Sequence, residues 1–331
     1  MTAVNRAARL LHAAPQEATL PVEVARCLFC KDSGATVVAR GRDYEYDTTP
    51  EIFDMVRCDG CGLIFIRPRP APEAMAVIYP ANYYAYNEEG GERPIVKRFR
   101  DRVEAVKVRR YVDLIGAGEA AVLDAGCGDG RLLDILQRLG PNPWQLAGVE
   151  IGEKAARRAA ARGFEVRCGD FEFLEFADWS DRFNLVLMHH VIEHTRDPRA
   201  AIRKVHGLLQ AGGIFSVDTP DTRAWDFRLF RDRYWGAYHI PRHFYLFSAG
   251  TLCRLLLEEG FEIVHARSIL SPAFWVHSVH NWLVDRSWGR SIAPYFQPQN
   301  LWAIAAATAL DSVQLATTRQ SSNLQVLARK V

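Results

Sequence analysis

The chain has 331 residues, enough for one large domain with accessory segments rather than several equal domains. Hydrophobic residues make up 49% and charged residues 24%, as in folded globular proteins, which excludes a disordered chain. A net charge of +2 gives no reason to expect nucleic-acid binding. No stretch reaches the roughly 18 apolar residues of a spanning helix, and residues 1–20 lack the apolar core of a signal peptide. We therefore expect a cytoplasmic protein.

Two cysteine pairs dominate the first part of the chain, after residues 1–21, which we expect to form a flexible arm. Both pairs have the spacing Cys-x-x-Cys, and residues 31–57 separate them. Two such knuckles can supply four thiolates to a tetrahedral zinc ion, whereas a redox or disulfide role is less suited to a reducing cytosol. Strands at 37–40 and 43–46 would complete the unit. We therefore predict a zinc ribbon over residues 22–70, with structural Zn²⁺ held by Cys27, Cys30, Cys58 and Cys61.

Residues 71–118 link the ribbon to the rest of the chain and contain a tyrosine cluster and a basic helix. The cluster holds Tyr83, Tyr84 and Tyr86. A tyrosine ring is flat and largely apolar and carries a hydroxyl, so the cluster either packs on the main domain or closes over an active site. For the second case Tyr84 and Tyr86 are the candidates. Residues 94–115 have the pattern of a basic amphipathic helix, whose charged face is either solvated or bound to an anion.

A glycine-rich turn organises the centre of the sequence. An apolar run ends at Asp124, Gly126, Gly128 and Gly130 follow, and residues 131–139 then have the apolar spacing of a helix. Glycine is required where the backbone adopts unusual dihedral angles or where a ligand approaches it closely. The first N–H groups of such a helix face whatever lies above the turn. Ordinary tight turns use the same residues, so the turn alone does not identify a binding site.

The next residues alternate strand and helix patterns, as parallel sheets do. Residues 145–149 predict a second strand that ends at Glu150, where an acid that binds a ribose is expected after such glycines. Residues 164–168 predict a third strand, followed by Asp170. Residues 183–188 predict a fourth strand, which runs into a histidine-rich segment.

These pieces together resemble class I S-adenosylmethionine-dependent methyltransferases. The matching segments are the glycine turn at 123–130, Glu150, Gly169-Asp170, residues 185–198 and residues 208–220. The resemblance implies an α/β fold, with a Rossmann-like, seven-stranded, doubly wound sheet whose last strand is antiparallel. We expect this core to span residues 119–270 and 320–331.

The resemblance also implies S-adenosylmethionine as the methyl donor. Gly126, Cys127 and Gly128 would approach its methionine part, and Asp124 would help to hold the amino-acid end. Glu150 can accept hydrogen bonds from both ribose hydroxyls. The further residues expected at the cofactor are Ile151, Asp170 beside the adenine amino group, Phe171 beside the ring, and His189.

The segment from His189 to His194 follows the fourth strand, where the methyl donor would lie. His190, Glu193 and His194 formally match an inverted zinc-protease motif, but their place above a cofactor-binding sheet argues against a protease. Three alternatives remain: a divalent ion such as Mg²⁺, a general base, or a Glu193–His194 pair that stiffens the loop. We take His190 as the base and His243 as the residue that binds or polarises the acceptor; His194 and Glu193 complete the set.

The remaining sequence completes the sheet and adds one insertion. Residues 213–218, 261–268 and 323–328 predict the last three strands, with helices after Asp197 and Ser248. Residues 271–319 leave this pattern and are rich in tryptophan and phenylalanine. We expect a helical insertion that covers the sheet edge, forms a homodimer interface or, least favoured, rests on a membrane.

The ribbon, the exit at 61–70, the tyrosine cluster and the core occur together in a recognisable group. The chain resembles the zinc-ribbon methyltransferases of bacterial sugar and secondary-metabolite pathways, including nucleotide-sugar C-methyltransferases. In those C-methyltransferases a tyrosine implicated in proton abstraction stands where this chain has Ile240. We therefore expect methyl transfer to a small polar metabolite, with oxygen favoured over carbon as the acceptor atom. The alternative is a non-catalytic cofactor-binding or assembly protein.

Overall fold

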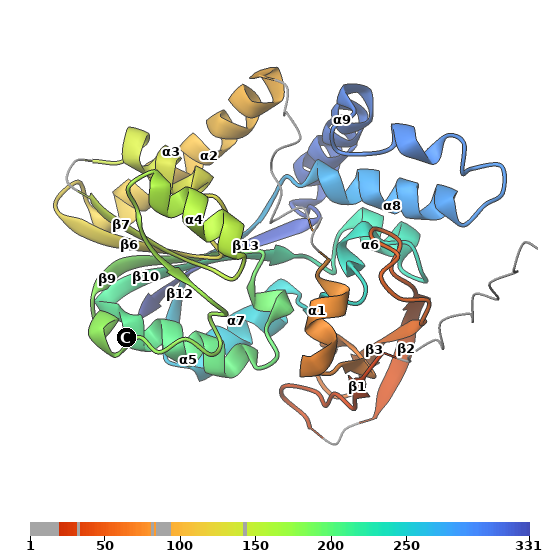
Figure 1. The fold of residues 1–331 in the computed structure, drawn as a ribbon, viewed down its shortest axis with the longest axis horizontal. Coiled ribbons are helices and arrows are strands. Elements are labelled where there is room, and N and C mark those ends of the chain that lie inside the picture. Colours follow the sequence, from red (N-terminus) through yellow and green to blue (C-terminus); the bar gives the residue numbers. More distant parts are fainter. Residues whose placement is uncertain (1–19, 32–33, 81–82, 84–93, 142–143) are drawn as a thin grey trace, which may run out of the picture.

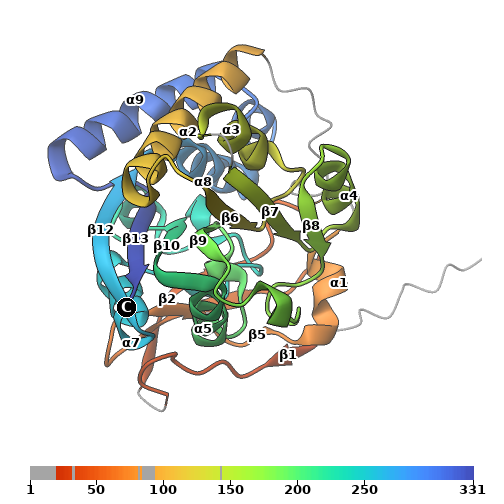
Figure 2. The same ribbon diagram turned by 90° about the vertical axis from the view of Figure 1, so that its left-hand side faces the viewer.

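A seven-stranded mixed sheet forms the centre of the molecule (Figures 1 and 2). The structure is a computed structural model, and it describes residues 20–31, 34–80, 83, 94–141 and 144–331. Most of the predicted N-terminal arm lies outside these ranges, as do Tyr84 and Tyr86.

The strand order of the sheet is β12-β13-β10-β9-β6-β7-β8, which Figure 2 displays from left to right. β6 pairs in parallel with β7 and β9, whereas β13 is antiparallel to both of its neighbours, β10 and β12. The predicted doubly wound sheet with an antiparallel last strand is confirmed. Its strands are β6 (Ala120–Ala125), β7 (Trp144–Glu150), β8 (Glu165–Cys168), β9 (Phe183–His189), β10 (Leu209–Pro220), β12 (Phe261–Ile269) and β13 (Asn323–Lys330).

Helices cover both faces of this sheet, because parallel neighbours need crossover connections. α2 (Pro94–Ile115), α3 (Arg131–Leu139) and α4 (Glu153–Ala161) lie on one face, and α5 (Pro198–Leu208) and α7 (Ala249–Glu258) on the other (Figure 1). The N-terminal caps expected at α5 and α7 are present. Asp197 accepts the N–H of Ala200 at 3.1 Å, and Ser248 forms a capping box with Thr251. This arrangement leaves the carboxyl ends of β6, β7 and β9 free for a ligand.

The N-terminal region forms a second, smaller sheet with the order β11-β4-β3-β2. β2 (Ala35–Gly41), β3 (Phe53–Cys58) and β4 (Ile64–Ile66) are the ribbon strands, and β11 (Tyr245–Leu246) joins them from the methyltransferase-like region. The sequence did not predict this pairing. Because of it, the ribbon is part of the packing of the main domain. β1 (Val22–Glu23), β5 (Arg69–Pro70) and α1 (Met75–Ile78) complete this region.

The predicted strand at 43–46 is wrong, because these residues form a turn. The Asp43 carboxylate accepts the backbone N–H groups of Glu45, Tyr46 and Thr48 at 3.0–3.2 Å. An aspartate that bonds its own following backbone favours a turn over a strand. The turn places Glu45 against the main domain, where it contacts His239.

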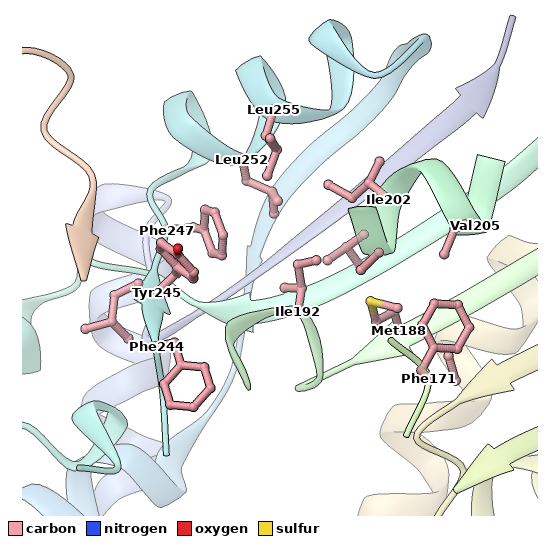
Figure 3. Close-up of a cluster of buried hydrophobic side chains, with 14 of the residues drawn as sticks. Phe171, Met188, Ile192, Ile202, Val205, Phe244, Tyr245, Phe247, Leu252 and Leu255 are labelled. Atoms are coloured by element: carbon pink, nitrogen blue, oxygen red, sulfur yellow. The ribbon is translucent and has the colours of Figure 1, made fainter. Parts of the chain in front are cut away.

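One hydrophobic core runs from the ribbon into the lower face of the central sheet. Figure 3 shows Ile192 between Phe244 and Phe247 on one side and Met188 on the other. Ile192 and Phe247 have no exposed surface, and Phe244 has 1%. The loop after β9 is therefore held in place by buried packing from both directions.

The predicted helical insertion consists of α8 (Pro272–Val284) and α9 (Leu301–Thr318), which pack against each other. α8 also packs on the turn at 236–238, and α6 (Trp225–Phe230) contacts α8. Within the described residues, none of the helices has the length and apolar character needed to cross a membrane.

Candidate active site

The glycine turn between β6 and α3 has the backbone conformation that its sequence predicts. Gly126 has a φ of 91°, and a side chain there would meet Val191 Cγ2 at 2.4 Å. Gly128 has a φ of 56° with open space where a Cβ would lie. The N–H groups of Gly126 and Cys127 donate to the carbonyl of Val149 at 2.8 and 3.0 Å. The turn is thus tied to β7 and leaves bare backbone facing the space above the sheet.

The Glu150 side chain, at the end of β7, connects the glycine turn to the loop that follows β7. Its Oε2 accepts the N–H of Gly128 at 2.9 Å, and its Oε1 accepts the N–H of Gly152 at 2.7 Å. Burial raises the pKa of this carboxyl, against the lowering effect of the two N–H groups. Each carboxylate oxygen accepts more than one hydrogen bond, so both retain capacity for ligand hydroxyls.

The other residues expected at the cofactor also lie around the carboxyl ends of β6, β7 and β8. Burial raises the pKa of Asp124 to about 7 and also raises the pKa of the Cys127 thiol. Asp170 Oδ1 accepts the N–H of Glu172 at 2.8 Å. Phe171 is only 5% exposed and packs against Phe176, so the hydrophobic core fixes this wall.

These residues line a single large cleft of about 1930 Å³. The same cleft reaches His189, His190 and His194 after β9, and continues to residues of α8 and α9. It therefore joins the predicted cofactor positions to most of the predicted catalytic histidines. The insertion at 271–319 forms one of its walls. The predicted cofactor residues on the cleft wall are Asp124, Gly126, Cys127, Gly128, Glu150, Ile151, Asp170, Phe171 and His189.

His190, predicted as the base, is hydrogen-bonded at both ring nitrogens. Its Nδ1 lies 3.1 Å from Glu193 Oε1, and its Nε2 lies 3.1 Å from the amide nitrogen of Asn323. Since the amide nitrogen only donates, the lone pair of His190 lies on Nε2 and is already used. The residue has a φ of 55°, a strained value for a histidine that its two hydrogen bonds help to maintain.

His194 and His243 lie together, with ring centroids 4.5 Å apart. The Nδ1 of His194 lies 3.0 Å from the Tyr79 hydroxyl and 3.2 Å from the carbonyl of Arg242. His243 Nδ1 lies 2.8 Å from the Ala237 carbonyl. Burial lowers the pKa of His194 to about 4 and lowers the pKa of His243 well below its usual value, so both rings are neutral near pH 7.

His189, on the cleft wall, also belongs to a largely buried network. Its Nε2 lies 3.2 Å from the Tyr111 hydroxyl and 3.3 Å from Ser216 Oγ. Asp218 lies nearby and receives a hydrogen bond from Lys107 Nζ at 2.8 Å. Burial would raise the pKa of Asp218, but His189 and Lys107 lower it to about 2. Lys107 shows that one residue of the basic helix points into the cleft rather than into solvent.

Glu193, His194 and His243 have ligand atoms within 4.8 Å of one another. Glu193 is fully buried, and its oxygens already accept hydrogen bonds from His190 and, at 3.0 Å, from Thr219. Mg²⁺ prefers oxygen ligands in octahedral geometry, whereas two of the three groups are neutral imidazoles. These residues do not fit the predicted Mg²⁺.

Several residues of the site were not identified from the sequence. Tyr79 and Tyr83 line the cleft, with ring centroids 5.0 Å apart. Tyr83 was noticed only as part of a cluster, and Tyr84 and Tyr86 lie outside the described residues. His239, which contacts Tyr83, and Glu45, which contacts His239, come from distant parts of the chain. No local pattern marks them, because only the docking of the ribbon on the main domain brings them together.

The four ribbon cysteines have sulfur atoms within 4.8 Å of one another. Sulfurs around a tetrahedral zinc ion are separated by roughly 3.8 Å, given Zn–S bonds of about 2.3 Å. Cys27 and Cys58 are buried, and burial raises the pKa of Cys27. The N–H of Gly62 donates to the Cys58 carbonyl at 2.9 Å and closes the second knuckle. The residues fit a closed, four-sulfur metal site.

Comparison with known proteins gives both family and relatives. A methyltransferase-domain family model matches residues 96–266, more than half of the chain. The ubiquinone biosynthesis O-methyltransferase of Xanthomonas oryzae pv. oryzae (strain PXO99A) is 30% identical over 40% of this chain and 55% of that protein. The protein of the same name from Caulobacter vibrioides (strain ATCC 19089 / CIP 103742 / CB 15) is 36% identical over 30% of this chain and 40% of its own length. The chain thus spans about half, or less, of these curated relatives.

Solved structures give partial resemblances. The Burkholderia thailandensis 1,6-didemethyltoxoflavin-N1-methyltransferase, with S-adenosylhomocysteine bound, has a TM-score of 0.48 and 16% identity over 86% of this chain and 98% of that one. The [4+2]-cyclase SpnF has a TM-score of 0.47 and 21% identity over 70% of this chain and 80% of that one. With the family match, the sheet order and the glycine turn in agreement, the chain belongs to the methyltransferase-domain family.

Proposed function

We propose that this protein transfers a methyl group from S-adenosylmethionine to an oxygen atom of a small metabolite. The observation that carries the proposal is the cofactor cradle: a bare glycine turn tied through Glu150 to the end of β7. S-adenosylmethionine has a ribose and an amino-acid end but no phosphate. A carboxylate beside bare backbone suits it better than a phosphate-binding loop would.

When bound, S-adenosylmethionine would supply an electrophilic methyl group on a sulfonium. The residues of this chain would then act by position. Glu150 would accept the ribose hydroxyls, Asp170 the adenine amino group, and Asp124 would lie near the cationic amino-acid end. Holding the acceptor in line with the methyl group supplies much of the acceleration in such reactions.

Oxygen is favoured over carbon as the acceptor atom because of residue 240. The Ile240 side chain packs toward the ribbon, where a Cβ on Gly41 would meet its Cδ1 at 2.9 Å. Position 240 thus offers no acid–base group. We propose a small polar acceptor, such as a sugar, a nucleotide-linked sugar or a biosynthetic intermediate. The name of the curated relatives supports an oxygen acceptor.

Calorimetry with S-adenosylmethionine and its demethylated product, S-adenosylhomocysteine, tests the proposal. Both should bind, and methyl-labelled donor incubated with hydroxylated metabolites should then give a labelled product. If neither compound binds at millimolar concentration, an S-adenosylmethionine-dependent methyltransferase activity is excluded. Tight binding without transfer to any oxygen, nitrogen or carbon acceptor would favour a non-catalytic, cofactor-binding protein.

We also infer that Cys27, Cys30, Cys58 and Cys61 hold one structural zinc ion. A site with four protein sulfurs has no open position for a substrate, so its contribution is to the folding of the ribbon. The ribbon in turn positions the loop that carries Asp43 and Glu45.

A further inference from the structure

We propose that Glu45, His239 and Tyr83 form a proton relay, through which the ribbon takes part in methyl transfer and Tyr83 removes the acceptor's proton. The inference rests on the proposed function. It assigns the base to a tyrosine rather than to His190, and it makes the ribbon part of the catalytic machinery.

The relay consists of two contacts to one imidazole. Glu45 Oε2 lies 2.8 Å from His239 Nδ1, and the Tyr83 hydroxyl lies 3.3 Å from His239 Nε2. A carboxylate beside Nδ1 accepts the hydrogen of that nitrogen, which leaves the lone pair on Nε2, facing the phenol. This is the logic by which an acid orients the histidine of a catalytic triad toward its hydroxyl nucleophile.

The relay is largely buried, and Tyr83 is its member on the cleft wall. His239 is 8% exposed and Tyr83 5%, and Tyr83 lines the cleft that contains the cofactor cradle. Burial would raise the pKa of Glu45, but His239 lowers it to about 2, so the carboxylate is ionised near pH 7. His239 has a φ of 41°, a strained conformation for a residue with a side chain.

The other histidines that face the cleft are less suited to receive a proton. His194 Nδ1 contacts the Arg242 carbonyl, which only accepts, so this nitrogen carries a hydrogen and cannot take the proton of Tyr79. His190 uses its lone pair on the Asn323 amide. Among the described residues, only the Tyr83–His239 pair combines a tyrosine of the cleft wall with an imidazole oriented by a carboxylate.

The proposed step couples methyl transfer to two proton transfers. The acceptor oxygen bonds to the methyl carbon as the C–S bond breaks, and the sulfur keeps that electron pair. The acceptor's hydroxyl proton moves to the Tyr83 oxygen while the proton of Tyr83 moves to His239 Nε2. The resulting imidazolium lies beside the Glu45 carboxylate, and its extra proton leaves to water after product release.

Several charged or titratable groups surround His239 from the elements packed against it. They are Glu45, Tyr46, Tyr83, His194, Arg242, His243 and His277.

Chemical labelling tests the relay without knowledge of the acceptor. Phenylmethanesulfonyl fluoride sulfonylates a phenol when a neighbouring base removes its proton, with loss of fluoride. Peptide mass mapping should find Tyr83 labelled, with a plateau rate reached below the pH of about 10 at which a free phenol ionises. Glu45→Gln should slow this labelling at least about tenfold, given the 10²–10⁴-fold contribution of a general base.

Tyr44→Phe is the matched control, because it removes a hydroxyl from the same loop that bonds Asp285 instead of His239. It should leave Tyr83 labelling unchanged, and Glu45→Gln should retain cofactor affinity in calorimetry. Absence of label on Tyr83, or an equal labelling rate in Glu45→Gln, would overturn the relay. The proposed function would survive that result if the cofactor still binds, and His190→Ala would then be expected to abolish transfer.

Discussion

The two sides of the cleft are built in different ways. The cofactor side consists of strand ends and turns that are close in sequence, and backbone N–H groups fix its key carboxylate, Glu150. The proposed acceptor side combines Glu45 from the ribbon, Tyr83 from the link and His239 from beyond β10. The first side therefore depends on local backbone conformation, and the second on the docking of two sheets. A change in the ribbon should therefore affect the acceptor side and leave the cofactor side unchanged.

Loss of the zinc site should have the largest effect. A structural zinc ion contributes on the order of 10 kcal/mol of apparent binding free energy to small zinc domains. Elemental analysis of protein purified without added metal should find about one zinc per chain, and Cys58→Ser should lose it with marked loss of thermal stability. Cys253→Ser, outside the cluster, is the control. Full zinc occupancy in Cys58→Ser would contradict the assignment.

Breaking the buried ion pair between ribbon and main domain should come next. Asp43 and Arg242 have fully buried side chains and a 2.6 Å contact. Asp43→Ala leaves an unpaired buried guanidinium, which typically costs about 3–5 kcal/mol. Urea unfolding measures this. The control is Asp47→Ala. The Asp47 side chain is 78% exposed and pairs with the half-buried Arg42, so its removal should lower the free energy of unfolding by less than about 1 kcal/mol. Equal losses of unfolding free energy in the two variants would show that the Asp43–Arg242 pair does not stabilise the packing of the ribbon on the main domain.

Glu150→Ala should weaken cofactor binding without a comparable loss of folding stability. It removes the acceptor for the ribose hydroxyls, and charge-assisted bonds contribute roughly 1.5–3 kcal/mol, so at least about a tenfold rise in Kd is expected. Asp170→Ala should act in the same direction but less strongly, because the adenine contact is a smaller part of the site. Calorimetry with S-adenosylhomocysteine checks both. An unchanged Kd in Glu150→Ala would mean that the cofactor lies elsewhere.

Between pH 6 and 7, the pH dependence of cofactor affinity should give the smallest effect. In the unliganded protein, burial raises the pKa of Asp124 to about 7. The folded state therefore retains a proton that the unfolded state has lost, and the stability of the fold falls as the pH rises from about 4 to 7. A cationic ligand favours the ionised carboxylate. Affinity for S-adenosylmethionine should therefore rise by up to about tenfold per pH unit below pH 7 and level off above it. Asp124→Asn should remove the slope, and a slope that persists there would assign it to another group.

Much of the fold and the cofactor side followed from the sequence, because each step uses neighbouring residues. Strand, glycine turn and helix occur within 120–139, and Glu150 follows at the spacing expected of an acid that binds a ribose. The caps at Asp197 and Ser248 were equally local.

The acceptor side could not be predicted in the same way. The pairing of β11 with β4 joins Tyr245 to Phe65, two short apolar segments without a distinguishing pattern. Asp43 was placed in a strand that would complete the unit between the two cysteine pairs, but its carboxylate accepts hydrogen bonds from the following backbone N–H groups and forms a turn. That turn delivers Glu45 to His239. An Asp followed by polar residues and Thr-Thr-Pro is a turn signal that, in retrospect, competes with the strand pattern.

Amide hydrogen exchange with and without S-adenosylhomocysteine tests the division of the cleft most directly. We expect added protection at 126–130, 150–152 and 169–171, and little change in ribbon strands β2 and β3. We also expect the same protected segments in Asp43→Ala under conditions where the main domain stays folded. Protection spread over the ribbon, or lost from the glycine turn in that variant, would contradict the claim that the two sides are built independently.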